Sequence, residues 1–253
     1  MNISGNTILV TGGSTGIGFA MAKQFVELGN EVIICGRRET RLKEAKEHVP
    51  QLHYKVCDLG NEKDRFELYS SVIKEFPSLN ILVNNGAYQN DYSLTDGLEA
   101  LRGAQEEINV ILTSPIMMNA LFTDHLSKQK NAAIVNVTSM LGFTPIPRIP
   151  VYCAAKAGFH TYTLLLRKQF ENAGIDIRVF EAPPPRVETE LNIEGRKKAN
   201  YDKTPKGLSP EEYADVVISG MKEDRLDIFM VIDGVDIWAH PRKDYELIRL
   251  NTV

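Results

Sequence analysis

Short, unbroken apolar runs alternate with longer helical stretches along most of this 253-residue chain. Unbroken apolar runs are typical of strands that are buried on both faces, and such strands form parallel sheets covered by helices. The stretches between them are long enough for crossover helices. The alternation therefore predicts an α/β fold with a doubly wound parallel sheet of about seven strands and helices on both faces. The expected strands are Thr7–Val10, Glu31–Cys35, His53–Val56, Ile81–Asn84, Ala133–Thr138, Asp176–Glu181 and Asp227–Ile232.

The length favours one domain, because 253 residues lie at the upper end of the range for a single α/β domain. No internal repeat or linker divides residues 1–253. One irregular stretch, at about residues 186–210, is rich in Pro, Lys, Arg and Asn. Long irregular segments inside compact domains are often functional. We expect a substrate lid there, with a plain surface insertion as the alternative.

Composition argues against several classes of protein. A net charge of −4 is unlike the basic excess of nucleic-acid binders, and no apolar run is long enough to span a bilayer. Residues 1–10 lack the basic start and apolar stretch of a signal peptide. Cys35, Cys57 and Cys153 are odd in number and lack CxxC spacing, so we expect buried, reduced thiols in a cytoplasmic protein. Five scattered histidines lend little support to a metal site.

The turn after the first expected strand carries a glycine-rich motif. The sequence from Thr11 to Gly18 reads TGGSTGIG and opens the first expected helix. Glycines let the backbone approach a pyrophosphate closely, and the amino end of the helix offers free N–H groups to the anion. We therefore expect a dinucleotide cradle in a Rossmann-type fold. Its candidate residues are Gly12, Ser14, Thr15, Gly16, Ile17 and Gly18.

The second strand leads into Arg37 and Arg38, with no acidic residue before Glu39. An acid near this point binds the ribose 2′-hydroxyl of NAD, whereas an arginine suits the 2′-phosphate of NADP. The arginines therefore favour NADP(H), with NAD(H) as the other possible cofactor. Asp58, after the third strand, either accepts a hydrogen bond from an adenine amino group or simply starts the next turn.

Tyr152 and Lys156 lie four residues apart at the head of a long expected helix that runs to about Asn172, so their side chains share one face. Ser139 ends the fifth strand, and Asn109 lies in a helical pattern before that strand. Each residue alone has an ordinary structural explanation, such as an exposed helix pair, a strand-end hydroxyl or a helix cap. The four in this order favour an active site over these separate explanations.

Taken in order, these motifs resemble the short-chain dehydrogenase/reductase family in its compact single-domain form. The likeness covers about residues 7–189 and rests on the glycine motif, Asp58-Leu59, Asn84-Asn85, Asn109, Ser139, Tyr152 and Lys156. Residues 27–37, 150–156 and 182–189 resemble, within the family, the oxidoreductases encoded with the teichoic-acid D-alanylation machinery of Gram-positive bacteria.

The resemblance implies a role for each catalytic candidate. Tyr152 would exchange a proton with the carbonyl oxygen, and Lys156 would favour its phenolate form. Ser139 would orient the carbonyl oxygen, and Asn109 would hold a water that passes protons from Lys156 to solvent. Further cofactor contacts are implied for Tyr152, Lys156, Leu59, Asn85, Gly86, Ala87, Pro184, Val187 and Thr189.

Two positions depart from the family pattern. Gly86-Ala87 reverses the usual Ala-Gly order after the fourth strand, and Pro185 replaces a usual glycine. Alanine is unfavourable at position 87 if that position needs a positive φ. Pro185 fixes its own φ and removes one N–H.

The sequence thus predicts an NADP(H)-dependent oxidoreductase that interconverts a carbonyl and a secondary alcohol by hydride transfer. The expected partners are a small-molecule carbonyl or alcohol and further copies of the chain in a homodimer or homotetramer. Neither nucleic-acid binding nor membrane insertion is expected. The alternative is a catalytically weak dinucleotide-binding sensor or scaffold. The departures from the family pattern at Ala87 and Pro185 are the reason to consider it.

Overall fold

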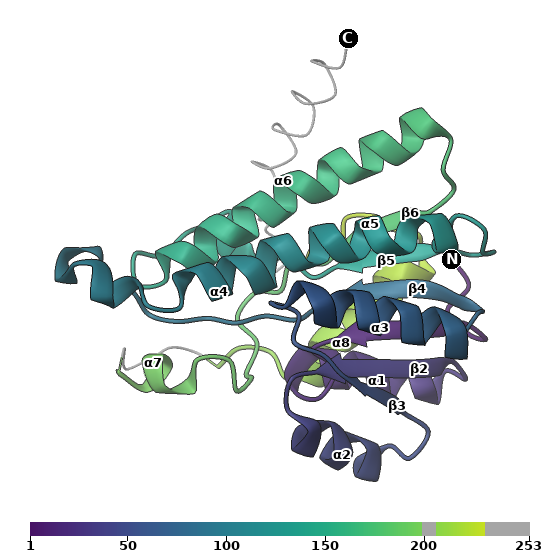
Figure 1. Cartoon of the computed structure of the whole chain (residues 1–253), viewed down its shortest axis with the longest axis horizontal. Coiled ribbons are helices and arrows are strands. Elements are labelled where there is room, and N and C mark those ends of the chain that lie inside the picture. The colour runs from purple at the N-terminus through teal and green to yellow at the C-terminus, as the bar shows by residue number, and fades with distance from the viewer. Residues whose placement is uncertain (199–205, 231–253) are drawn as a thin grey trace.

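The computed structural model describes residues 1–198 and 206–230. Its six-stranded sheet has the order β3-β2-β1-β4-β5-β6, and all neighbouring strands pair in parallel (Figure 1). The strands are β1 (Thr7–Thr11), β2 (Glu31–Gly36), β3 (His53–Val56), β4 (Leu79–Asn84), β5 (Ala133–Asn136) and β6 (Arg178–Glu181). The predicted doubly wound parallel sheet is confirmed.

The expected seventh strand is reduced to one bridge in the described residues. Asp227 pairs with Glu181 in an isolated parallel bridge, and Ile228 donates its N–H to the carbonyl of Glu181 at 2.8 Å. Ile228 is fully buried and packs where a Cβ on Gly220 would meet it. Its apolar character therefore reflects packing on a helix rather than an extended strand. Residues 231 and 232 lie outside the described residues.

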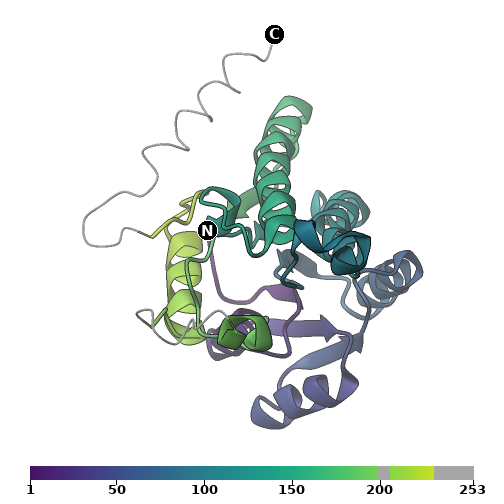
Figure 2. The ribbon, with the colours of Figure 1, turned by 90° about the vertical axis from the view of Figure 1, so that its left-hand side faces the viewer.

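Helices cover both faces of the sheet, as the end-on view in Figure 2 shows. On one face lie α1 (Gly16–Glu27), α2 (Glu39–His48) and α8 (Pro210–Lys222), and on the other α3 (Glu62–Glu75), α5 (Ser114–Leu126) and α6 (Pro150–Ala173). Shorter elements are α4 (Ala104–Ile108), the π-helical segment η3 (Asn109–Thr113), α7 (Ile193–Lys198) and the 3₁₀ turns η1 (Leu94–Asp96), η2 (Leu98–Leu101) and η4 (Met140–Gly142).

The double burial of the sheet explains its unbroken apolar runs. In β1, Ile8 and Val10 point into the core beneath α1 and α8, whereas Leu9 points into the core beneath α3, α5 and α6. Each fully buried aliphatic side chain contributes about 1.5–3 kcal/mol to the driving force for folding. Both faces of the strand therefore have to be apolar.

The cysteines behave as expected, since Cys35, Cys57 and Cys153 are buried free thiols. No helix in the described ranges has both the length and the apolar character needed to cross a membrane.

The strand order places one crevice in the molecule. From β1 the chain winds outward through β2 to β3 and then returns to β4 on the other side of β1. The loops that follow β1 and β4 consequently run in opposite directions from neighbouring carboxyl ends. Open α/β sheets bind their ligands at such a point.

Helix α8 offers a direct test of local sequence signals. The Ser209 hydroxyl accepts from the Glu212 N–H at 3.1 Å, and the Glu212 carboxylate accepts from the Ser209 N–H at 2.7 Å. We expect Ser209→Ala to lower the free energy of unfolding by about 1 kcal/mol, because one helix N–H loses its acceptor. Urea denaturation measures this. Ser219→Ala, at an exposed site on the same helix, is the control, and an equal loss there would contradict the assignment.

Candidate active site

The crevice is closed at its base by Thr11. The Thr11 hydroxyl accepts from the backbone N–H groups of Asn85 (2.9 Å) and Gly86 (3.1 Å) and donates to the carbonyl of Val83 at 3.1 Å. The Asn85 amide donates back to the carbonyls of Thr11 (3.0 Å) and Gly12 (3.2 Å). These bonds hold the loops after β1 and β4 against each other.

The turn between β1 and α1 forms a cradle that packs closely against the loop after β4 because it is made of glycine. Gly12 has a φ of +62°, and a Cβ there would lie 2.8 Å from the Cα of Gly86. Helix α1 begins at Gly16, and within the described chain no side chain caps its amino end. Free N–H groups and the positive end of the helix dipole therefore face the crevice. This donor set fits the pyrophosphate of a dinucleotide.

A cleft of about 380 Å³ opens beside this turn. Most of the predicted cofactor residues line it, namely Gly12, Ser14, Thr15, Gly16, Ile17, Arg37, Arg38, Asp58, Leu59, Asn85, Gly86, Ala87 and Thr189. Gly18 does not line the cleft. A Cβ at that position would clash with the Gly12 carbonyl and the Asn85 amide. Gly18 thus allows the turn to pack rather than touching the cleft.

A second cleft of about 120 Å³ holds the catalytic candidates. Ser139, Tyr152, Lys156, Pro184 and Val187 line it. Both clefts are lined by Ile17, Asn85, Ala87, Gln89, Thr189 and Leu191, so they form one continuous crevice. Leu191 belongs to the predicted lid, whereas Gln89 was not among the predicted site residues. The position of Gln89 shortly after the matched Asn84-Asn85 motif was the available signal.

Arg37 and Arg38 differ in their surroundings. The Arg37 guanidinium donates to the Glu106 carboxylate and lies 5.6 Å from the centre of the Tyr88 ring. Arg38 forms no side-chain hydrogen bond or ion pair with any residue in the described ranges. Both line the larger cleft, but among the described residues only Arg37 has an acidic partner, which leaves the charge of Arg38 available to a ligand.

Tyr152 and Ser139 meet in the smaller cleft. Burial raises the pKa of Tyr152 to about 12, and a hydrogen bond with Ser139 partly opposes that rise. The Ser139 hydroxyl also accepts from the Leu141 N–H at 3.1 Å, which fixes its orientation. The phenol is therefore protonated at neutral pH, and the Ser139 hydroxyl lines the same cleft.

Lys156 is buried one helical turn beyond Tyr152. Its Nζ donates to the carbonyl of Val137 at 2.7 Å and lies 5.8 Å from the centre of the Tyr152 ring. Burial lowers the pKa of Lys156 to about 7, because an ammonium ion loses its hydration there. An amine in this state can take up or release a proton near neutral pH.

Asn109 lies at the first residue of the π-helical segment η3. Its carbonyl accepts from the N–H of Ser114, five residues on, and its side chain accepts from Gln105 at 3.1 Å. The segment packs against α6, where Leu112 faces Gly158. Asn109 lines neither cleft. π-Helical bulges occur often at functional sites, and no sequence signal marked this one.

Ala87 does not adopt the positive φ that would be unfavourable for alanine. Among the described residues other than glycine, a positive φ occurs at Asn131, Asn192 and Asp224, so Ala87 adopts an ordinary conformation. Gly86 also lacks a positive φ, but a Cβ there would run into the Leu59 side chain. The reversed order therefore puts the smaller residue beside the Leu59 side chain.

Glu107 is a buried carboxyl group near the site that sequence reasoning missed. Its Oε2 accepts from the Tyr92 hydroxyl at 2.8 Å and from the Asn90 N–H at 3.1 Å. Burial raises the pKa of Glu107 to about 7. The sequence pair Glu106-Glu107 does not reveal which of the two is buried.

The expected lid is described as residues 186–198 and 206–210, and residues 199–205 lie outside the described residues. The helix α7 interrupts the expected irregular stretch and lies, in Figure 1, on the same side as the amino end of α6. Asn192 donates to Asp91 at 2.7 Å, and Arg148 forms an ion pair with the same carboxylate. The segment is thus fastened beside the crevice, and its role as a lid stays a prediction.

Comparison with known proteins agrees with this geometry. Residues 6–200 match the family described as short chain dehydrogenase. The chain is 46% identical over 228 residues to the uncharacterized oxidoreductase DltE of Bacillus subtilis (strain 168), covering 90% of this chain and 89% of that protein. The predicted likeness to the family, and to its branch associated with D-alanylation, is confirmed.

Two solved structures share the fold. A short-chain dehydrogenase from Sphingobium yanoikuyae in complex with NADPH superposes with a TM-score of 0.80 at 22% identity, over 98% of this chain and 96% of that one. A short-chain dehydrogenase/reductase from Burkholderia phymatum in complex with NAD superposes with a TM-score of 0.82 at 19% identity, over 99% and 96%.

The buried ammonium of Lys156 predicts a pH dependence of stability. Its pKa is about 7 in the folded chain and about 10.4 when unfolded. Between these values the unfolded chain binds the extra proton, so the stability of the folded chain rises with pH. We expect the wild type to gain about 1 kcal/mol per pH unit over Lys156→Met between about pH 7.5 and 9.5. Urea denaturation across this range measures the difference, and parallel profiles would contradict the prediction.

Proposed function

Because the chain belongs to the short-chain dehydrogenase/reductase family, we propose that it interconverts a carbonyl group and a secondary alcohol with NADP(H). One observation carries this proposal. The uncapped amino end of α1 and the group of Ser139, Tyr152 and Lys156 open into one continuous crevice. A dinucleotide held at the first would have its reactive end near the second. The substrate is a small molecule that enters the smaller cleft.

A bound nicotinamide would supply or accept the hydride, while this chain's residues handle the oxygen and its proton. Tyr152 donates its proton to the carbonyl oxygen. Its pKa of about 12 keeps the phenol protonated at neutral pH. Ser139 donates a hydrogen bond to the same oxygen and stabilises the developing negative charge. In the direction of oxidation the two residues act in reverse.

Lys156 resupplies the proton. A pKa of about 7 lets its amine exchange protons with both a phenol and water at neutral pH. When protonated it favours the phenolate of Tyr152. Asn109 holds the water that connects Lys156 with solvent, from the π-helical segment that packs against α6.

The cofactor preference rests on the two arginines after β2. The turn from Gly12 to Gly18 binds the pyrophosphate, and Arg38 binds the 2′-phosphate of NADP(H), with Arg37 beside it. Asp58 and Leu59 lie at the adenine end, and Thr189 and Val187 at the nicotinamide end. The fold itself accommodates both cofactors, since its structural neighbours contain NADPH and NAD.

We also infer that residues 1–253 act as a single domain, with residues 186–210 as the substrate lid. Leu191 supports this role because it lines both clefts. Self-association in a homodimer or homotetramer is part of the same proposal, and the half-exposed Leu165 on α6 is an apolar side chain for such a contact.

The proton donor is tested by Tyr152→Phe. We expect kcat for carbonyl reduction to fall by about a hundredfold to ten-thousandfold, because the phenolic proton is lost, while the dissociation constant for NADPH stays nearly unchanged. Stopped-flow or steady-state absorbance of NADPH and fluorescence titration measure the two quantities. Turnover that survives the change would show that Tyr152 is not the acid. Binding of the dinucleotide by wild type without turnover of any carbonyl would favour the sensor or scaffold instead.

The cofactor preference is tested by titrating wild type and Arg38→Ala with NADPH and NADH. We expect wild type to prefer NADPH, and Arg38→Ala to bind it about tenfold to a hundredfold more weakly, since a hydrogen bond to a charged group is worth about 1.5–3 kcal/mol. NADH binding should hardly change. Arg102→Ala, an exposed arginine paired with Glu99, is the control. A wild-type preference for NADH would overturn the assignment.

A further inference from the structure

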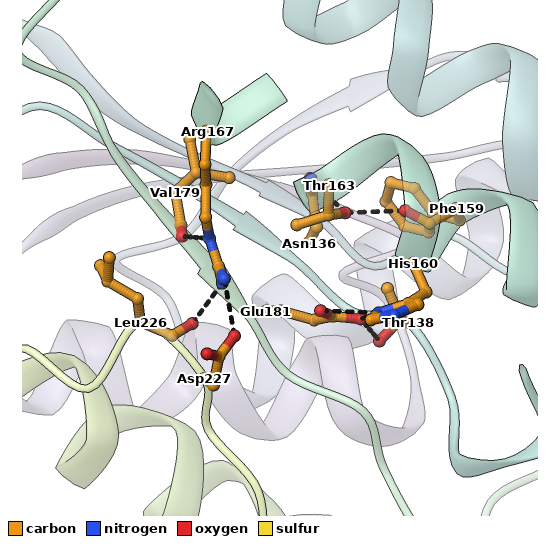
Figure 3. A network of polar contacts seen from close by, with 10 residues as sticks. All are labelled: Asn136, Thr138, Phe159, His160, Thr163, Arg167, Val179, Glu181, Leu226 and Asp227. Carbon is orange, nitrogen blue, oxygen red and sulfur yellow. Dashed lines mark hydrogen bonds and ion pairs between the residues drawn. The ribbon is translucent and has the colours of Figure 1, made fainter. Parts of the chain in front are cut away.

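Glu181 is a carboxyl group buried behind the candidate active site. It ends β6, and its side chain is 0% exposed. Its Oε1 accepts from the Thr138 hydroxyl at 2.8 Å. The Nδ1 of His160 lies 2.9 and 3.0 Å from its two oxygens (Figure 3). Burying a carboxylate is unfavourable unless hydrogen-bond donors surround it, so this arrangement needs both partners.

Thr138 lies between Val137 and Ser139, just after the end of β5. On one side of it, the carbonyl of Val137 accepts from Lys156 at 2.7 Å. On the other side is Ser139. A hydrogen bond that holds the Thr138 side chain against Glu181 therefore also restrains both neighbours. Thr138 and Ser139 both border the smaller cleft, and the Thr138 hydroxyl is turned toward Glu181.

His160 lies on the helix that carries the other half of the site. It follows Lys156 by one turn of α6 and Tyr152 by two turns, so the three side chains share a face. Its side chain is 16% exposed, and the Phe143 ring packs edge-on against it with ring centres 4.4 Å apart. Glu181 thus joins the strand end of Ser139 to the helix of Tyr152 and Lys156.

Two further contacts tie the same helix to the sheet, farther from the site. Thr163 accepts from Asn136 at 3.0 Å. Arg167 donates to the carbonyl of Val179 at 2.7 Å and to Asp227 at 2.6 Å (Figure 3). Arg167 therefore also anchors α6, but three turns beyond Lys156. It provides a control that separates stability from alignment.

We propose that Glu181 and His160 are positioning residues whose contact, together with Thr138, sets the spacing between Ser139 and the Tyr152–Lys156 pair. This inference rests on the proposed function, in which the Ser139 and Tyr152 hydroxyls address one carbonyl oxygen. Both hydroxyls then have to lie within about 2.7–3.1 Å of that oxygen. A displacement of about 1 Å can lower the rate about a hundredfold.

The test compares variants that break the contact with one that keeps it. His160→Leu removes the ring nitrogen, and Thr138→Val removes the hydroxyl with little change of shape. Glu181→Gln keeps both contacts, because its oxygen can accept from Thr138 and its NH₂ can donate to the His160 ring. Arg167→Met is the control for a loosened helix.

We expect His160→Leu and Thr138→Val to lower kcat by about tenfold to a hundredfold with the NADPH dissociation constant unchanged. Glu181→Gln should retain most of the wild-type kcat. Arg167→Met should lower the melting temperature and leave kcat unchanged. If kcat instead follows the melting temperature across all four variants, or if both breaking variants keep full activity, the contact is structural and the proposal is overturned.

A second readout does not depend on turnover. The ¹⁹F resonance of 3-fluorotyrosine at position 152 reports the surroundings of the phenol, and residue 160 is eight residues, or about 12 Å along the helix, away. The resonance should move in His160→Leu and Thr138→Val, and stay in place in Glu181→Gln and Arg167→Met. If the wild type reduced no carbonyl, the proposed function would fail while this comparison still decided the positioning role. An unmoved resonance in both breaking variants would overturn it.

Discussion

The candidate site depends on the parallel pairing of β1, β4, β5 and β6, because this pairing brings four carboxyl ends to one edge of the sheet. Asn84 is paired with Asn136, and Asn136 with Glu181, across three neighbouring strands. The amide of Asn84 donates to Asn136 at 2.9 Å, in full burial. Slipping a strand by one residue would turn these polar groups toward the opposite face and leave them unpartnered. The same polar row that fixes the register therefore fixes where Ser139 stands.

Burial then sets the chemistry that this edge can perform. It raises the pKa of Tyr152 to about 12 and lowers that of Lys156 to about 7. Both effects have one cause, which is that a charged group loses hydration in the interior. The result at neutral pH is a phenol that keeps its proton beside an amine that can exchange one. A buried phenol and a buried amine make this part of the core less stable than apolar side chains of the same shape would. The buried contacts of Glu181 with Thr138 and His160 lie beside them.

Local motifs made much of this predictable from the sequence, and long-range contacts limited the rest. The turn after β1 and the spacing of Tyr152 and Lys156 are written in consecutive residues, so the sequence predicted the cradle and the shared helix face. The pairing of Arg37 with Glu106 joins residues 69 positions apart, and no periodicity indicates it. The contact between His160 and Glu181 requires both the helix face and the strand register to be known.

The two departures from the family pattern become intelligible once packing is considered. A Cβ at Gly86 would meet the end of the Leu59 side chain, so glycine leaves Leu59 its space, and Ala87 needs no unusual backbone. The carbonyl of Pro184 accepts a hydrogen bond from the Met140 N–H at 3.0 Å, which holds the loop after β6 in place. A proline at position 185 is compatible with such a loop, because proline restricts the backbone of the unfolded chain as well. Both departures therefore adjust the walls of the crevice to their neighbours. Neither supplies a structural reason to separate dinucleotide binding from catalysis in this chain.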